Sequence, residues 1–93
     1  MGRKAREKPE RLGEKLTQIR SALGLSQNEM LSRLGLDDKL YRDDVSKYER
    51  GVREPSVIVM LRYARAAGIC TDVLLDDELD LPAKLPAKPK HSG

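Results

Sequence analysis

The chain is short of the residues on which most enzyme chemistry and most metal sites depend. Its 93 residues include one Cys, one His and neither Trp nor Phe. A metal site built from His and Cys needs several such ligands within reach, and His91 and Cys70 stand alone. A single Cys also excludes a disulfide framework. We therefore expect no catalytic machinery, no metal site and no cofactor.

Long apolar runs are absent as well. No stretch approaches the roughly 18 apolar residues of a membrane span, and the first residues lack the apolar core of a signal peptide. The lone Cys70 agrees with a reducing compartment. These absences predict a soluble protein of the cytoplasm with no membrane contact.

Charge is distributed unevenly along the chain. Residues 1–20 carry seven basic and three acidic side chains, residues 21–83 carry eight and twelve, and residues 84–93 carry three and none. The basic ends of the chain could therefore bind a polyanionic partner. Residues 21–83 could bind one only if their few basic side chains share one face.

Composition divides the chain into three parts. Residues 1–10 alternate charged residues with almost nothing apolar, and are predicted to form a flexible basic arm. Residues 11–80 are predicted to fold as one domain. Residues 81–93 repeat Leu-Pro-Ala-Lys and are predicted to form a disordered tail, in which the prolines favour an extended chain over packing.

The first two helices are indicated by apolar spacing and by their end signals. Apolar residues at helical spacing run from 12 to 23, and Gly24 follows as a C-cap. Ser26 and Glu29 have the spacing of a capping box, and Gly35 ends the second helix. A turn of about three residues joins the two.

A third helix is predicted from Tyr41, Val45 and Tyr48, which lie at i, i+4 and i+7, with its end at Gly51 and its start uncertain. A fourth helix follows Pro55-Ser56 and ends at Gly68. A fifth short helix is predicted with Thr71 as its cap. No stretch alternates apolar and polar residues in the way typical of a strand. The expected fold is therefore all-α, a compact five-helix bundle.

Residues 11–75 resemble the Cro/CI-type (XRE) helix-turn-helix regulators, whose fold is lambda-repressor-like. The resemblance rests on Ser-Gln at 26–27, Leu-Gly at 34–35, Val-Ser-Lys-Tyr-Glu-Arg-Gly at 45–51 and Arg-Glu-Pro-Ser at 53–56. It implies a DNA-binding transcriptional regulator, most simply a repressor associated with the nucleoid. It also implies that the third helix lies in the major groove of double-stranded DNA and that the protein binds as a homodimer.

The resemblance also implies roles for particular residues. The position that contacts phosphate from the second helix is Gln27, and the positions that meet base edges are Arg42, Asp43 and Lys47. Arg and Lys suit this role because they can reach guanine O6 and N7. Arg50 and Arg53 fall near the end of the third helix, where the family contacts the DNA backbone. A structural ion pair between the first and third helices falls on Arg20 and Glu49, where it would fix the tilt of the third helix.

The sequence departs from the family pattern in two places. The connection before Val45 is about four residues longer than usual, so residues 37–40 or their neighbours are an insertion. A position on the second helix that is usually a small Ala is Leu31. We infer that the two changes compensate, because a longer connection lets the third helix sit further out over a bulkier residue.

Four carboxylates lie near the face expected to meet phosphates: Asp37, Asp38, Asp43 and Asp44. They suggest an alternative in which the scaffold binds a protein, as an adaptor or antitoxin-like partner. Asp43 could instead accept a hydrogen bond from cytosine N4, and Asp38 could be an N-cap. We favour capping and solvated charge at a helix start over base reading for these residues.

Three further features have simpler explanations. The three tyrosines, Tyr41, Tyr48 and Tyr63, are expected to pack with buried rings and surface hydroxyls. Cys70 is expected to be a small apolar residue beneath the last helix. The acidic cluster at 76–80 is expected to face away from nucleic acid and could border a dimer surface.

Overall fold

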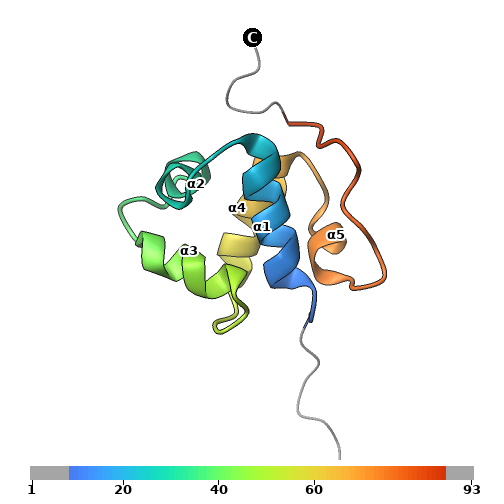
Figure 1. Ribbon diagram of the computed structural model, residues 1–93, viewed down its shortest axis with the longest axis horizontal. Helices are drawn as coiled ribbons and strands as arrows, with labels where there is room; N and C mark the ends of the chain where they lie inside the picture. Colours follow the sequence, from blue (N-terminus) through green and yellow to red (C-terminus); the bar gives the residue numbers. More distant parts are fainter. Residues whose placement is uncertain (1–8, 88–93) are drawn as a thin grey trace, which may run out of the picture.

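Five helices make up the part of the chain described by the computed structural model, residues 9–87 (Figure 1). They are α1 (Leu12–Leu23), α2 (Gln27–Leu34), α3 (Arg42–Glu49), α4 (Val57–Ala67) and α5 (Thr71–Leu75), and no strand occurs within this range. Helix α1 contacts α3, α4 and α5, and α2 packs against α3 and α4. In Figure 1, α2 and α3 therefore lie on one side of α1 and α5 on the other.

The helix ends follow the local signals in the sequence. Gly24, Gly35 and Gly68 each take a left-handed conformation as C-caps of α1, α2 and α4. Ser26 and Glu29 form the predicted capping box, in which the Ser hydroxyl accepts from the Glu29 amide and the Glu carboxylate accepts from the Ser26 amide. Such caps satisfy backbone groups that a helix leaves unpaired at its ends.

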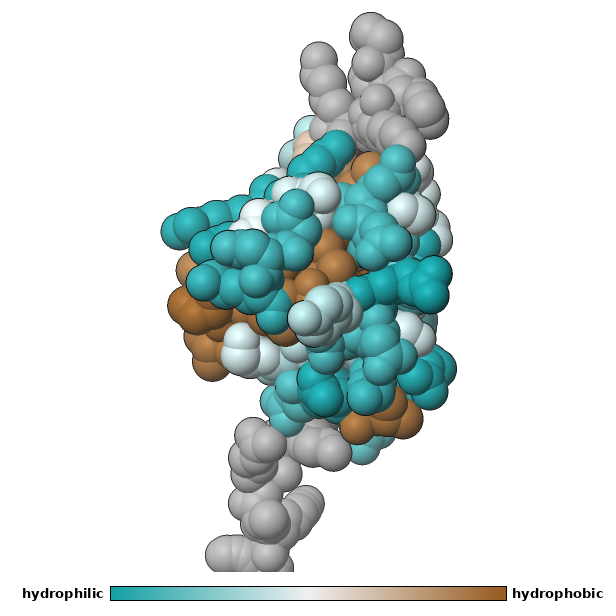
Figure 2. Space-filling model, turned by 90° about the vertical axis from the view of Figure 1, so that its left-hand side faces the viewer, coloured by the Kyte–Doolittle hydropathy of each residue, from teal (hydrophilic) through white to brown (hydrophobic). Residues whose placement is uncertain are grey.

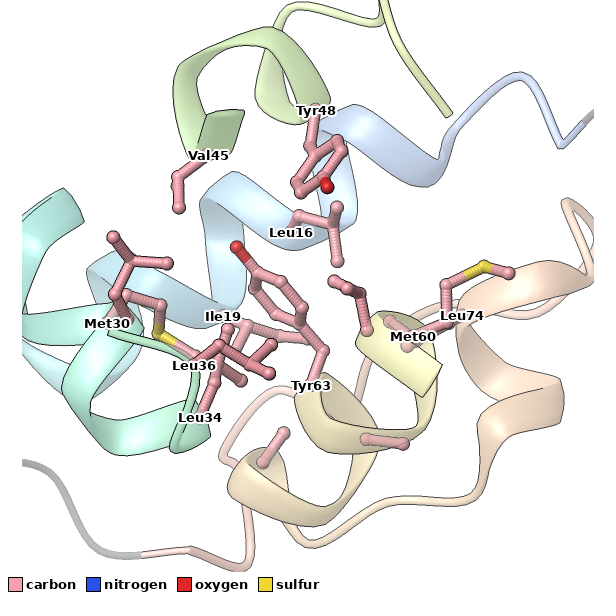
Figure 3. Close-up of a cluster of buried hydrophobic side chains, with 14 of the residues drawn as sticks. Leu16, Ile19, Met30, Leu34, Leu36, Val45, Tyr48, Met60, Tyr63 and Leu74 are labelled. Carbon is pink, nitrogen blue, oxygen red and sulfur yellow. The ribbon is translucent and has the colours of Figure 1, made fainter. Parts of the chain in front are cut away.

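The apolar faces of all five helices meet in one core. Figure 3 shows Val45 and Tyr48 pointing from α3 toward the residues of the other helices. The apolar residues with no measurable exposure are Leu16, Ile19, Leu23, Met30, Val45, Tyr63, Ala67 and Leu74. Leu31, the bulky residue on α2, belongs to the same core with 3% of its surface exposed.

Helix α1 crosses the end of α3 at Gly13. A Cβ atom at this position would lie 2.7 Å from the carbonyl oxygen of Glu49 and 2.9 Å from that of Tyr48. Both distances are shorter than a carbon and an oxygen tolerate. The absence of a side chain at residue 13 therefore sets how closely the two helices approach.

The tyrosines do not all behave as predicted. Tyr48 and Tyr63 are buried, but the hydroxyl of Tyr63 is buried too and has no hydrogen-bond partner among residues 9–87, so its expected place at the surface is wrong. Burial, with a smaller contribution from Glu49, raises the pKa of Tyr63 above its usual range. Tyr41 is 78% exposed, so the predicted burial of its ring is wrong as well.

The segment from Leu81 returns to the helices. Leu81, Leu85 and Ala87 pack against the core, and the Ala87 amide donates to the Ala67 carbonyl at 3.3 Å. The prediction that this segment does not pack is therefore wrong for residues 81–87. An extended chain can still place leucines four residues apart against an apolar surface. Residues 88–93 and residues 1–8 of the predicted arm lie outside the described residues.

Candidate functional site

Helix α3 has an inner and an outer face. Val45 and Tyr48 are three residues apart and both are buried, which anchors the helix to the core. Arg42, Asp43 and Arg50 are exposed, and the Lys47 side chain is 37% exposed. Figure 2 views the side of the molecule on which α2 and α3 lie in Figure 1, and most of this surface is hydrophilic.

An ion pair fixes α3 to α1. Arg20 donates from Nε to Glu49 Oε2 at 2.6 Å and from Nη2 to Glu49 Oε1 at 3.0 Å, so the pair is bidentate. Only 7% of the Glu49 side chain and 21% of the Arg20 side chain are exposed. The hydrogen bond to Glu49 raises the pKa of Arg20. The positions predicted for a structural ion pair are thus in contact.

Two further contacts extend this network to α2. Arg20 Nη1 donates to the carbonyl of Leu25, in the turn between α1 and α2, at 3.1 Å. The Gln27 amide donates to Glu49 Oε1 at 3.2 Å from the first residue of α2. Gln27 therefore lies beside the ion pair, at the N-terminal end of α2, and the network connects α1, α2 and α3.

Asp44 joins the two ends of α3. Its Oδ2 accepts from the Tyr41 amide at 2.9 Å, and its Oδ1 accepts from Arg53 Nη1, in the loop after α3, at 2.6 Å. The bond from the Tyr41 amide, followed by the pairing with Arg53, holds the pKa of Asp44 below its usual value. This carboxylate is therefore already neutralised within the chain, and it places the Arg53 guanidinium beside α3.

The other candidate side chains near α3 are partly engaged. Lys47 Nζ lies 3.3 Å from Asp43 Oδ2, one turn earlier on α3. Arg50 Nε donates to Ser46 Oγ at 3.2 Å. Arg42 differs, since within the described part of the chain its exposed guanidinium has neither a hydrogen bond nor an ion pair.

The start of α3 differs from one expectation. The helix begins at Arg42 with Tyr41 as its N-cap residue, so the prediction that Asp38 could cap it is wrong. Asp38 instead lies exposed in the turn before the helix, where Asp37 accepts a long hydrogen bond of 3.4 Å from Ser32. Asp43 and Asp44 lie in the first turn, where a helix dipole favours negative charge.

A second polar cluster ties the start of α1 to the end of α5. Asp77 accepts from the backbone amides of Glu10 and Arg11 at 2.9 and 3.0 Å, and Arg11 pairs with Asp80 at 2.7 Å. The two amide bonds lower the pKa of Asp77. Asp76 accepts from the Glu78 amide at 2.9 Å, so three of the four acidic residues at 76–80 are engaged within the chain. No local signal in the sequence indicates the two contacts that reach back to the start of α1.

Lys15 completes this cluster. Its Nζ donates to the carbonyls of Val73 and Asp76 at 2.7 and 2.8 Å, and the residue is fully buried. Burial is the main cause that lowers the pKa of Lys15. A buried lysine at a position of apolar spacing cannot be recognised from sequence, because its acceptors lie about 60 residues away.

The last helix differs from expectation at its start. The N-cap residue of α5 is Cys70, so the prediction that Thr71 caps the helix is wrong. Cys70 is exposed, so its predicted place beneath the helix is also wrong. Within residues 9–87, no group of three or more His, Cys, Asp or Glu side chains could hold a metal ion, and none of the helices there has the length and apolarity to cross a membrane.

Comparison with known proteins bears on the fold. The sequence matches no protein-family model and no curated protein. Among solved structures, the chain is similar to the P22 c2 repressor, which was crystallised with the synthetic operator 9T in the presence of Tl+. The TM-score is 0.61 at 24% sequence identity, over 71% of this chain and 94% of that chain. The predicted all-α repressor fold with its helix-turn-helix is therefore confirmed.

Proposed function

We propose that the protein binds double-stranded DNA sequence-specifically and represses transcription, with α3 in the major groove. One observation carries the proposal: α3 is anchored to the core by Val45, Tyr48 and the Arg20–Glu49 pair. Its outer face offers Arg42, which has no hydrogen bond or ion pair with residues 9–87. A rigid helix with exposed cations on its outer face suits the groove of a polyanion. The P22 c2 repressor, which has the same fold, was crystallised with operator DNA.

The contacts around α3 suggest a role for each polar residue. Arg42, at the first position of the helix, reads a base edge, and Lys47 reads a second one after exchanging Asp43 for a guanine acceptor. Asp43 is then released to accept from a cytosine N4 group, or stays in solvent. Each partner exchange lowers the net gain from DNA contact, so we expect Arg42 to contribute more than Lys47.

Phosphate contacts are assigned to three residues around this helix. Gln27 has one amide hydrogen on Glu49, and its second hydrogen remains for a phosphate oxygen at the start of α2. Arg50 and Arg53 lie beyond the end of α3 and are held by Ser46 and Asp44. Such contacts position the protein without reading sequence.

We further propose that the protein acts in the cytoplasm as a homodimer associated with the nucleoid. A dimer places two copies of α3 about one helical turn of DNA apart, on a two-fold symmetric site. The proposal assigns the protein no catalytic step, no cofactor and no metal.

The acidic-adaptor alternative draws less support from the geometry. Asp44 is bound to Tyr41 and Arg53, Asp43 pairs with Lys47, and Asp37 accepts from Ser32. Of the four, Asp38 and the weakly bonded Asp37 therefore offer the carboxylate charge that remains for a protein partner. The double variant Asp37→Lys and Asp38→Lys separates the two functions, since DNA affinity should stay unchanged or rise, whereas an adaptor would lose its partner.

The direct test is selection of bound duplexes from random DNA at several salt concentrations. We expect a two-fold symmetric consensus and an affinity that falls as salt rises. Arg42→Ala should reduce the binding free energy for the selected duplex by roughly 1–3 kcal/mol. It should also relax the base preference at one position of the site. Arg65→Ala, which removes an exposed arginine near the end of α4, is the matched control and should bind as the wild type. Failure to enrich any sequence, even at low salt, contradicts the proposal.

A further inference from the structure

The longer connection before α3 forms an ordered turn. The amides of Lys39 and Leu40 both donate to the Leu36 carbonyl at 2.9 Å. Leu36 is buried, and Leu40 packs against the core beside it. The inserted residues are therefore anchored at both ends, and the turn leads into α3 along a fixed path that ends at Tyr41.

Tyr41 combines a fixed backbone with an exposed side chain. Its amide donates to Asp44 Oδ2, and its carbonyl accepts from the Asp44 amide at 2.9 Å. The residue is 78% exposed, whereas the other two tyrosines of the chain, Tyr48 and Tyr63, are buried. Tyr41 thus carries a large ring that lies outside the core. It follows the ordered turn and directly precedes Arg42.

The position of this ring relates it to the proposed DNA contact. In a helix-turn-helix, residues at the N-terminal end of the recognition helix meet the base edges. Tyr41 is the N-cap residue of α3, and Arg42, Asp43 and Asp44 follow it with charged side chains. Among residues 9–87, Tyr41 is therefore the large exposed apolar side chain at this end of α3.

We propose that Tyr41 determines sequence specificity by packing its ring against the C5-methyl group of a thymine in the major groove. This inference rests on the proposed DNA binding. The thymine methyl is the apolar feature that base edges present in that groove, and it suits an apolar ring. The carboxylates of Asp43, two residues after Tyr41, and of the exposed Asp38, three residues before it, disfavour a phosphate near the ring but do not repel a methyl group.

The inference also gives the insertion a function. Because residues 37–40 form an anchored turn, they hold Tyr41 at the start of α3 with little loss of backbone freedom on binding. A shorter connection would have to bring the chain into α3 along another path. The added residues thus extend the reading surface by one side chain.

The test compares the wild type, Tyr41→Ala and Tyr41→Phe on duplexes selected by the wild type. We expect Tyr41→Ala to lose discrimination at one thymine position by about fivefold or more. Tyr41→Phe should keep it, since the ring is retained. Replacing that thymine by uracil should weaken the wild type and Tyr41→Phe but leave Tyr41→Ala unchanged. Ile58→Ala, which truncates another exposed apolar side chain, on α4, is the control.

The results that would contradict the proposed DNA binding differ from those that would contradict the role of Tyr41. If the wild type selects no sequence, the proposed function fails, and the inference fails with it. If the wild type selects a site but Tyr41→Ala keeps the same preferences, the inference alone is overturned. It is also overturned if Tyr41→Phe loses as much as Tyr41→Ala, because the hydroxyl rather than the ring would then make the contact.

Discussion

The Arg20 guanidinium on α1 and the Glu49 carboxylate at the end of α3 form a bidentate pair with bonds of 2.6 and 3.0 Å. The two residues are 29 positions apart in the sequence. Since both side chains are mostly buried, each depends on the other to compensate for its lost hydration. The pair therefore links the end of α3 to α1 inside the protein rather than at an exposed surface.

Truncating either partner should destabilise the protein. We expect Arg20→Ala to lower the free energy of unfolding by about 2 kcal/mol, because Glu49 is left buried and, of its partners among residues 9–87, its carboxylate keeps the Gln27 amide alone. Urea unfolding of both single variants and the double variant measures the coupling. Arg65→Ala should change stability by less than about 0.5 kcal/mol. Strict additivity of the two truncations would show that the pair is not coupled.

Gly13 should not tolerate a side chain. Alanine favours helices over glycine by about 1 kcal/mol, so Gly13→Ala would stabilise an isolated α1. In the protein its Cβ would meet the carbonyl oxygens of Tyr48 and Glu49, and we expect a net loss of roughly 1–3 kcal/mol. Ser21→Ala, at an exposed position of the same helix, is the control. A Gly13→Ala variant that is more stable than the wild type would disprove the close crossing.

Stability should depend on the ionisation of Asp44. Its pKa in the folded protein lies below the ordinary value of 3.8, so its ionised form stabilises the fold. That contribution is complete above the unfolded pKa and is lost as the pH falls through the lower, folded pKa. Asp44→Asn should therefore be less stable than the wild type at pH 7, and the two should converge only below pH 3.8.

Thermal unfolding from pH 7 to pH 2 measures this difference. Asp38→Asn removes an exposed carboxylate from the preceding turn and controls for the change in net charge at pH 7. A gap between Asp44→Asn and the wild type that stays constant down to pH 2 would mean that the hydrogen bonds of Asp44 do not depend on its charge.

The elements of the fold that could be predicted from sequence are those with local signals. Gly24, Gly35 and Gly68 end helices because a left-handed residue is needed there, and the Ser26 capping box is closed within four residues. The contact between Arg20 and Glu49 was implied by the family resemblance. In each case the deciding interaction lies within one helix turn or follows a known motif.

The features that sequence could not supply depend on distant partners. Lys15 is buried because two carbonyls of the α5 region face it, and Asp77 caps the start of α1 from 66 residues away. The exposure of Tyr41 follows from the path of the inserted turn, which periodicity alone does not describe. Leu85 packs because the helices leave an apolar surface for it, although Pro86 follows it directly.

The measurement that tests the central claim most directly is an amide chemical-shift titration of the full chain with its selected duplex. If α3 enters the major groove, the amides of Arg42, Asp43 and Lys47 should shift most, and those of α5 and residues 76–80 should stay unchanged. Arg42→Ala should reduce the shifts along α3 at equal duplex concentration. Shifts confined to α5 and residues 76–80, with the amides of α3 unaffected, would contradict the account.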